Sequence, residues 1–438
     1  MVRRDIMVYA GSVTPRLSYV AGLVLGDMLG LSYEIVSDRR RLGSYPFINY
    51  SNDHQMEGGF TILPSGLLAE DGIRDFMPVA ERTDGDSLIL FPSGDKGDIS
   101  FDIFSAVFYM VSRYEEYLPY RPDNHGRFPA EASFACRNGF LNIPVVDIWV
   151  GILKMKLLKY NPYLTFRRSE FRGIVTFDLD VAYAFRGRGL LRTAGGVLRD
   201  VAKGRNPLDR LRSVAGLKDD PYDVYDYILE SLRKSGCEAL FFIPLGRLSV
   251  NDRNCSRRSG AYSSLVSRIS TAHRCGIHLS YLAGSDYSLI TAEKEAFIRI
   301  TGDAPEYSRN HYLRLSLPGG YRALTAAGIG NDFTMGYADM PGFRAGTSLP
   351  FLFYDLVGES ATSLKVWPFQ VMDVTLRNYL KCDVSQACGI IDDIADRVSE
   401  VGGTFISVWH NTSLTEDDGW EGWREPFEHL LRRTGPDE

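Results

Sequence analysis

The sequence predicts an α/β protein in two parts, a smaller N-terminal α/β domain and a distorted or incomplete C-terminal (β/α) barrel. The chain has 438 residues and 45% apolar side chains, which is enough for two domains with ample cores. Beyond residue 170, short apolar runs alternate repeatedly with helical patterns, as they do in parallel βα units. We therefore expect domains at 1–165 and 166–438, with the change of pattern near 162–170.

The N-terminal domain mixes short strands with helices. Apolar runs bounded by Gly and Pro predict strands at 6–9, 33–36, 47–50, 60–63 and 88–91. Apolar residues at helical spacing predict helices at 15–29, 102–118 and 145–160. In the helix expected at 102–118, we interpret Arg113, Glu115 and Glu116 as an ordinary charged face; docking against the second domain is the alternative.

The C-terminal domain is predicted to start with a buried strand that runs directly into Asp178 and Asp180. Further strands are expected at 239–243, 276–281, 333–337 and 404–409. Helices are expected at 222–234, 262–273, 292–300, 321–327 and 420–432, with a long helix inside 373–401. Because so many βα units follow one another, a barrel is favoured over an open sheet.

Charge and cysteine usage exclude several classes of protein. The net charge of −6 gives no overall case for nucleic-acid binding. None of the six cysteines forms a Cys-x-x-Cys pair, so neither a zinc knuckle nor a disulfide framework is predicted, and the pattern suits a reducing compartment. No signal peptide is recognisable, and no apolar run reaches the roughly 18 residues of a membrane span. We therefore expect a cytoplasmic protein.

One segment, an insert at 186–216, differs from the rest of the chain in charge. Its basic residues are Arg186, Arg188, Arg192, Arg199, Lys203, Arg205, Arg210 and Arg212. Between Arg186 and Arg212 only Asp200 and Asp209 oppose them. We expect a solvated surface loop. The alternative is a lid or arm that contacts an anionic glycan, a lipid-linked glycan or membrane headgroups.

Polar side chains gather at the predicted carboxyl ends of the barrel strands. Asp178 and Asp180 are one residue apart, so both would point the same way from the end of their strand. Two neighbouring carboxylates repel each other unless a metal or a shared proton stabilises them. Later strand and loop ends supply His278, Arg309, His311 and His410. Each alone is more often structural, but parallel barrels keep their chemistry at this end, so we treat the group as a candidate site.

These motifs resemble those of the NodB-type polysaccharide deacetylases, carbohydrate esterase family four. The stretch Thr176-Phe177-Asp178-Leu179-Asp180 resembles the family's Thr-Phe-Asp-Asp-Gly with an inserted residue. His278-Leu279-Ser280 resembles the start of His-Ser/Thr-x-x-His, and Trp409-His410 resembles Leu-x-His. Arg309, followed by Pro318 and Gly319, is a looser match to the third motif. More narrowly, nearly the whole chain is similar to an uncharacterised deacetylase-like group of Bacteroidetes-type bacteria.

The resemblance implies a metal-dependent hydrolase that removes an N-acetyl or related acyl group from a sugar or polysaccharide precursor. In that family a divalent metal, usually zinc, activates a water molecule. By motif position, Asp178 would be the catalytic base and His410 the general acid. Asp180 and His278 would bind the metal, and Arg309 would orient Asp178.

One departure from the family concerns the second His of the second motif. Its position here is Leu282, which cannot bind a metal. We expect His311 to complete the ligand set, because it is an imidazole on the same predicted face. Three protein ligands would leave an open position for water, as catalytic metal sites require. If no residue completes the set, no metal binds.

The substrate groove is the least defined part of the prediction. Asp339 and Phe343 are the nearest match to the family's fourth motif, an Asp-rich loop with an aromatic residue. Arg344 and Tyr281 are further substrate-binding candidates, the latter because its ring can stack on a sugar.

Two other functions remain open at this point. Asp-x-Asp after an apolar strand, here Asp178 and Asp180, is also how many glycosyltransferases hold a manganese ion and a nucleotide sugar, and that chemistry needs no set of His residues. A non-catalytic glycan-binding protein on a decayed barrel would explain the missing His and the weak fourth motif. Substitution of His410 separates a hydrolase from a transferase, and metal binding separates both from a binding protein.

Overall fold

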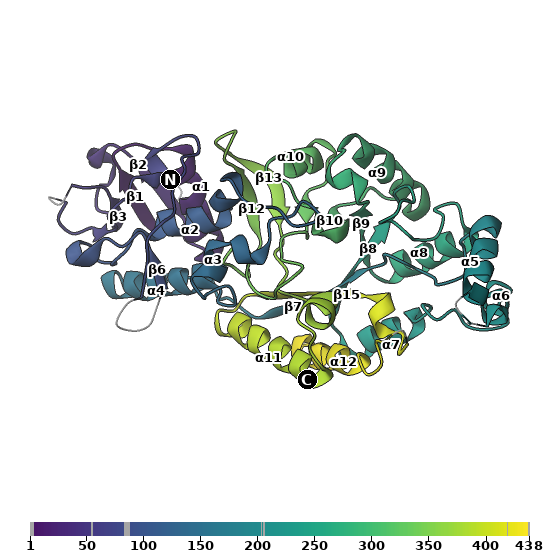
Figure 1. The fold of residues 1–438 in the computed structure, drawn as a ribbon. Coiled ribbons are helices and arrows are strands. Elements are labelled where there is room, and N and C mark those ends of the chain that lie inside the picture. Colours follow the sequence, from purple (N-terminus) through teal and green to yellow (C-terminus); the bar gives the residue numbers. More distant parts are fainter. Residues whose placement is uncertain are drawn as a thin grey trace.

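The computed structural model describes residues 4–53, 56–82, 88–202, 204, 206–417 and 419–436. Lys203 and Arg205 of the basic insert lie outside the described residues. Figure 1 shows an elongated molecule with the N-terminal part at one end, a large sheet in the middle and a pair of helices at the far end. The large sheet holds the candidate site.

The N-terminal part is built on a four-stranded parallel sheet in the order β2-β1-β3-β4, with a separate antiparallel pair, β5 and β6. The strands are β1 (Ile6–Ala10), β2 (Tyr33–Val36), β3 (Phe47–Tyr50), β4 (Phe60–Thr61), β5 (Ala80–Arg82) and β6 (Leu88–Leu90). Alternate apolar side chains such as Ile6, Val8 and Ile48 are buried, which is why the short apolar runs form strands. All five strands predicted for this part are present.

The helices are α1 (Pro15–Ala21), α2 (Ile103–Val111), α3 (Phe134–Arg137), α4 (Val145–Tyr160), α5 (Leu190–Ala202), α6 (Pro207–Val214), α7 (Tyr225–Ser235), α8 (Gly260–Ala272), α9 (Ser288–Thr301), α10 (Gly319–Ala326), α11 (Val384–Glu400) and α12 (Arg424–Thr434). Each of the nine predicted helices corresponds to a helix of the structure, although the lengths differ, and α3, α5 and α6 were not predicted. The helix predicted at 15–29 is α1 continued by a π-helical segment, Gly22–Met28. α4 has the predicted bounds.

The helix predicted at 102–118 is wrong in its second half. α2 starts after Asp102, whose carboxylate caps the helix by accepting from the Ser105 N–H, and it ends at Val111. Arg113 then adopts a left-handed conformation with φ 54°, and a 3-10 turn follows at Tyr114–Tyr117. This break turns the following charged residues away from solvent and into the protein.

The interpretation of Arg113, Glu115 and Glu116 as a solvated helix face is also wrong, because all three are buried. Arg113 forms ion pairs of 2.8 Å with both glutamates. Glu116 also receives hydrogen bonds of 2.9 and 2.7 Å from Arg344, which lies 228 residues later in the chain. The alternative, docking against the second part of the chain, describes these residues correctly.

A nine-stranded sheet forms the second part, in the order β12-β13-β11-β10-β9-β8-β7-β15-β14. Its strands are β7 (Arg172–Asp178), β8 (Glu238–Pro244), β9 (Arg274–Leu279), β10 (Tyr307–Asn310), β11 (Asn331–Asp332), β12 (Phe351–Asp355), β13 (Ser360–Val366), β14 (Val371–Met372) and β15 (Thr404–His410). Only the β12–β13 pair is antiparallel. The strand predicted at 333–337 is wrong, because β11 ends at Asp332 and the chain continues there as an irregular segment.

The α/β class is confirmed, but the strand pairing shows an open sheet whose edges are β12 and β14. The segment that follows β13 passes from β11, on one side of the parallel strands, to β15, on the other side. Trp367 N–H donates to Asp332 O at 2.8 Å, and Gln370 N–H donates to Ile406 O at 3.0 Å. This segment therefore links β11 to β15. Among the described residues, the strands themselves do not pair into a closed barrel.

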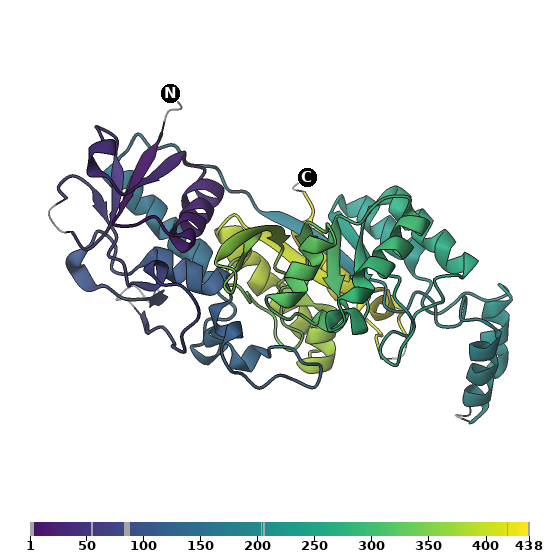
Figure 2. The ribbon, with the colours of Figure 1, turned by 90° about the horizontal axis from the view of Figure 1, so that it is seen from above.

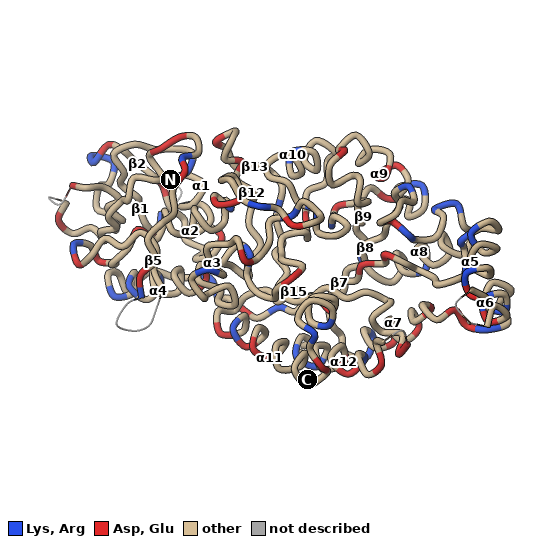
Figure 3. Tube along the Cα trace, in the orientation of Figure 1, with Lys and Arg blue, Asp and Glu red and all other residues tan. Residues whose placement is uncertain are grey.

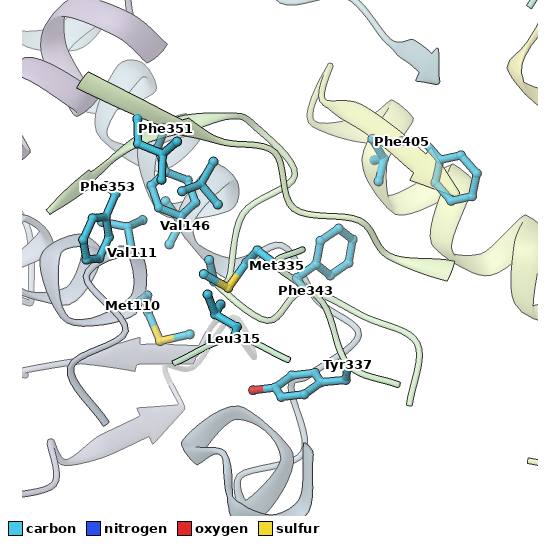
Figure 4. Close-up of a cluster of buried hydrophobic side chains, with 14 of the residues drawn as sticks. Met110, Val111, Val146, Leu315, Met335, Tyr337, Phe343, Phe351, Phe353 and Phe405 are labelled. Carbon is cyan, nitrogen blue, oxygen red and sulfur yellow. The ribbon is translucent and has the colours of Figure 1, made fainter. Parts of the chain in front are cut away.

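One continuous apolar core joins the two parts. Figure 4 shows Met110 and Val146 of the N-terminal helices beside Met335 and Phe351 of the second part. Burial of this kind contributes roughly 25 cal/mol per Å² of apolar surface. The N-terminal part is thus held against the sheet by apolar packing and by the buried Glu116–Arg344 pair.

A buried carboxylate in this junction makes stability depend on pH. Asp147 of α4 accepts hydrogen bonds from the Ser348 N–H and the Thr347 hydroxyl, both at 2.7 Å. Burial raises the pKa of Asp147 from 3.8 to about 6, although these hydrogen bonds oppose the shift. Because the folded-state pKa is the higher one, the stabilising effect of the protonated form is complete below about pH 4 and is lost as the pH rises through about 6.

We expect the free energy of unfolding of the wild type, relative to Asp147→Asn, to fall by about 3 kcal/mol between about pH 4 and pH 7. The Asn variant keeps the shape of the side chain and does not titrate. Urea unfolding of both proteins across this pH range measures the difference. A difference that stays constant with pH would contradict a raised pKa for Asp147.

The basic insert is helical, so the expected solvated loop is wrong. α5 and α6 form a helical hairpin at the end of the molecule. Figure 2 shows this hairpin projecting from the body, on the side opposite the N-terminal part. Within the described residues, every helix is too short or too polar to cross a membrane.

Candidate metal centre

The candidate centre lies at the carboxyl end of β7, which is hydrogen-bonded between β8 and β15. The residues that lead to it, Val175 and Phe177, are fully buried, so β7 is an inner strand with a continuous apolar run. The strand ends at Asp178, and the chain turns over the edge of the sheet at Asp180. Both side chains therefore meet the ends of the neighbouring parallel strands.

Asp178 is buried and paired with an arginine. Arg309 Nη1 donates to Asp178 Oδ1 and to Thr176 Oγ1, each at 2.8 Å, and Arg309 Nε donates to Phe333 O at 3.0 Å. The other carboxylate oxygen, Oδ2, lies 3.9 Å from Nε2 of His278. One oxygen of Asp178 is thus held by a buried cation, and the other faces the centre.

Three imidazoles surround Asp180. His278 Nε2 lies 3.0 Å from its Oδ1, and the Nε2 atoms of His311 and His410 lie 3.2 and 3.5 Å from its Oδ2. His278 comes from β9, His311 follows β10, and His410 ends β15. Together with the pair Asp178 and Arg309, these four side chains are the six residues predicted as catalytic or metal-binding, and the structure brings all of them together.

Each imidazole is oriented through its other ring nitrogen. The Nδ1 contacts are His278 to Arg309 O at 3.0 Å, His311 to Asp252 Oδ1 at 2.8 Å and His410 to Asp373 Oδ1 at 2.8 Å. Carbonyl and carboxylate oxygens can only accept here, so each Nδ1 carries a proton. Every Nε2 is consequently directed at Asp180, which is the usual arrangement of metal-ligating His residues and their outer partners.

The charged groups of the centre shift one another's pKa values. Burial alone would raise the pKa of Asp180, but His311 and His278 hold that pKa well below its usual value. Burial opposes a charge on His311, yet Asp180 and Asp252 raise its pKa to about 10. The pKa of His410 is likewise raised to about 10 by its carboxylate neighbours in spite of burial. A metal ion competes with protons for these nitrogens.

Asp180, His278 and His311 fit a divalent cation. One ligand atom from each lies within 4.8 Å of the others. Asp180 Oδ1 is buried and has no hydrogen-bond partner among the described residues. His278 has its Nδ1 proton bonded to Arg309 O and its Nε2 3.0 Å from this oxygen, so a cation or a proton between the two atoms would stabilise the contact. Two imidazoles and one carboxylate are also a donor set of catalytic zinc sites.

The backbone next to His311 is strained. Tyr312 and Leu313 adopt left-handed conformations, with φ of 58° and 55°. Such conformations cost about 1–2 kcal/mol for residues other than glycine and are concentrated at functional sites. Leu282, at the position of the family's missing ligand, is exposed and does not line the site cavity. His311 thus reaches Asp180 from a different strand end.

A cavity of about 460 Å³ opens over the centre, large enough for a small ligand. Its lining includes three aromatic residues, Tyr312, Tyr379 and Trp420, which the sequence did not single out. Arg253 and Arg127 add positive charge to the lining. Aromatic rings with a polar group suit the faces and hydroxyls of a sugar.

The four residues predicted to bind substrate do not line this cavity. Phe343 is completely buried, and Arg344 is buried in an ion pair, so their assignment to a groove is corrected to a structural role. Asp339 is half-buried and lies outside the lining. Tyr281 lies beside the cavity, with its ring 5.2 Å from the ring of the lining residue Tyr312.

Sequence reasoning missed the two carboxylates that orient imidazoles, Asp252 and Asp373. Asp373 follows directly after β14, so the same pattern that identified Asp178, an apolar strand ending in Asp, could have found it. Asp252 lies in the long loop after β8, where no local pattern distinguishes it from a solvated residue.

Comparisons with known proteins give distant similarities. A model described as a family of unknown function, DUF7033, matches residues 6–162. No curated protein matches the sequence. Among solved structures, the chain is similar to polysaccharide deacetylases. One is a protein from Mycobacterium smegmatis that is described as a polysaccharide deacetylase, with 15% identity over 61% of this chain and 86% of that chain and a TM-score of 0.40. Another is a polysaccharide deacetylase from Bacillus cereus, with 14% identity over 60% of this chain and 86% of that chain and a TM-score of 0.27.

A third similar structure is a family 4 carbohydrate esterase from Streptomyces lividans in complex with acetate. The identity is 12%, the matched region covers 60% of this chain and 85% of that chain, and the TM-score is 0.27. At these identities and TM-scores, the likeness does not establish an activity. The function has to be inferred from the site itself.

Proposed function

We propose that the protein is a metal-dependent hydrolase that removes an N-acetyl or related acyl group from a sugar or polysaccharide precursor. The observation that carries this proposal is the convergence of His278, His311 and His410 on Asp180, with the Nδ1 of each imidazole already bonded to an acceptor. A purely structural His rarely needs such an arrangement. Three of them around one carboxylate favour a metal centre.

Zinc is the metal that the donor set suits best. Asp180, His278 and His311 would hold it, and three protein ligands leave a position open. When bound, it would polarise the acyl carbonyl and lower the pKa of a water molecule. The aromatic residues that line the cavity support a carbohydrate as the substrate. The cytoplasmic location and the grouping with Bacteroidetes-type proteins stay predictions from the sequence.

Asp178 and His410 are suited to move the protons of the reaction. Arg309 holds Asp178 Oδ1, so Oδ2 is the atom that accepts a proton from the attacking water. His410 Nε2 faces the centre and donates a proton to the leaving amine. Asp373 keeps the proton of His410 on Nδ1 and stabilises the charged ring before that transfer.

The geometry is less favourable to a glycosyltransferase. In that function Asp178 and Asp180 would share a cation, but Asp178 already has a buried arginine on Oδ1. The three imidazoles would also have no role. A non-catalytic glycan-binding protein does not need the hydrogen-bonded carboxylates behind His311 and His410. Each alternative nevertheless predicts a distinct result when turnover and metal content are measured together.

The zinc-loaded protein should release acetate from N-acetylated oligosaccharides, and His410→Gln should lower kcat on the order of 10²-fold, because one proton donor is lost. Zinc content should remain at the wild-type level, since His410 is outside the proposed ligand set. Acetate release is measured by enzymatic assay and zinc by mass spectrometry.

The matched control is His429→Gln, which alters a His that pairs with Asp392 on the surface of α12. It should retain full activity. Release of a nucleoside diphosphate from a nucleotide sugar, unaffected by His410→Gln, would instead identify a transferase. Oligosaccharide binding with no turnover in the zinc-loaded protein would identify a binding protein.

A further inference from the structure

Helix α5 turns its apolar face towards solvent. Leu190, Leu191, Leu198 and Val201 have exposed fractions of 90%, 92%, 73% and 60%. At 3.6 residues per turn these side chains occupy one face about 100° wide. The buried positions of the helix are Gly196 and Asp200. This is the reverse of a normal surface helix, which buries its apolar face.

Helix α6 has the same inverted arrangement. Leu208, Leu211 and Val214 are exposed by 44% to 52%, whereas Arg210 and Ser213 are buried. The two helices are joined by a buried ion pair, in which Arg210 Nε and Nη2 donate to Asp200 at 2.6 and 3.1 Å.

Gly196 makes this ion pair possible, because a Cβ there would lie 2.6 Å from the guanidinium carbon of Arg210. The hairpin therefore has a polar interior and an apolar exterior. Apolar residues exposed along one face of a helix, unlike scattered exposed residues, usually mark a contact with another apolar phase.

Exposed cations flank the apolar faces. Arg199 on α5 and Arg212 on α6 are exposed, and neither forms an ion pair with any residue that the structure describes. Figure 3 shows basic residues gathered on α5 and α6. Between Arg186 and Arg212 the sequence has eight basic residues and two acidic ones, although the whole chain has a net charge of −6.

We propose that the α5–α6 hairpin docks on the surface of an anionic lipid membrane, with its exposed Leu and Val side chains in the headgroup region. Apolar side chains flanked by arginines are the features of helices that lie in the membrane plane. With 13 residues α5 is about 20 Å long, too short to span a bilayer. The basic residues argue for anionic lipids rather than for a second copy of the chain, which would bring like charges together.

The hairpin and the candidate site share a lining residue. A cavity of about 890 Å³ at the base of the hairpin is lined by both basic and acidic residues, among them Arg192, Arg253 and Asp219. Arg253 is also common to the cavity above the candidate metal centre. The docking itself does not depend on the proposed hydrolase activity.

The test is co-sedimentation of the full-length protein with vesicles of phosphatidylcholine alone or mixed with phosphatidylglycerol. The wild type should sediment with the anionic vesicles and much less with the neutral ones. The triple variant Leu190→Ser, Leu191→Ser, Leu198→Ser should bind anionic vesicles at least about tenfold more weakly. The matched control changes three exposed apolar residues elsewhere, Val79→Ser, Met155→Ser and Val357→Ser, and should bind like the wild type.

Three outcomes would overturn the proposal. They are a wild type that stays in the supernatant, a control that loses binding as much as the hairpin variant, and a dimer in solution that dissociates in the hairpin variant without vesicle binding. Circular dichroism and zinc content check that the variants are folded. His311→Ala should bind vesicles like the wild type, so failure of docking and failure of the metal site are separate results.

A charge variant tests the choice of lipid. Arg199→Glu with Arg212→Glu should remove the preference for phosphatidylglycerol, and wild-type binding should weaken as salt is added. Binding that is insensitive to both the charge variant and salt would contradict an anionic surface.

Discussion

Replacing His311 with Ala should remove zinc from the protein and lower deacetylase activity on the order of 10³-fold or more. His311 is one of only two imidazoles in the proposed ligand set, and its Nε2 lies 3.2 Å from Asp180 Oδ2. Its Nδ1 is held by Asp252, which keeps Nε2 directed at Asp180. The expected zinc content falls from about one ion per chain to a small fraction of that value.

Metal content is measured by mass spectrometry after reconstitution and dialysis, and acetate release is measured on the same samples. His273→Ala is the matched control, because His273 ends α8 and packs against Phe241, away from the centre. One zinc per chain in His311→Ala, with activity retained, would show that the ligands are not those proposed. Absence of zinc from the reconstituted wild type would remove the basis of the hydrolase proposal.

The placing of the site residues could be predicted because it follows from strand topology. Asp178 and Asp180 sit at the carboxyl end of β7, and His278 and His410 at the ends of the parallel strands β9 and β15. Adjacent parallel strands align these ends, so the sequence pattern alone implies that the side chains meet. His311 was found by the same reasoning, although no family motif includes it.

Residues whose environment depends on long-range packing could not be predicted in this way. Arg344 and Phe343 occur in a polar, Gly-containing segment that resembles a binding loop. In the structure, Arg344 pairs with the buried Glu116, and Phe343 packs in the apolar core. Arg113 has the spacing of a helix face, and only its left-handed conformation turns it inward. Partners 200 or more residues away leave no local signal for such burial.

The hairpin shows a different limit. Composition identified the segment 186–216 as basic and predicted a solvated surface loop, whereas the segment forms the helices α5 and α6. The structure places Gly196 and the Asp200–Arg210 pair inside the hairpin. The choice between an inward and an outward apolar face depends on which residues of α6 oppose α5, and spacing along the sequence does not specify it.

Asp178→Asn should lower kcat on the order of 10⁴-fold while zinc stays bound, because the variant loses the base at the centre and the carboxylate that pairs with Arg309. Asn keeps the shape of Asp but cannot accept a proton from water. Arg309 is completely buried, so its charge would remain without a counter-ion, and the thermal midpoint should also fall. KM should change little, because Asp178 acts on the proton rather than on the sugar.

Steady-state assays of acetate release give kcat and KM, and mass spectrometry gives the zinc content of the same protein. Asp339→Asn is the matched control, since Asp339 is a half-buried carboxylate outside the cavity. A small effect on kcat with zinc retained would mean that Asp178 only balances the charge of Arg309. Loss of zinc together with activity would mean that Asp178 is itself a ligand, and the base would then have to be sought among the other side chains that face the cavity. Because Asp178 Oδ1 is held by Arg309 and Oδ2 faces His278, proton transfer with the metal retained is the outcome that the geometry favours.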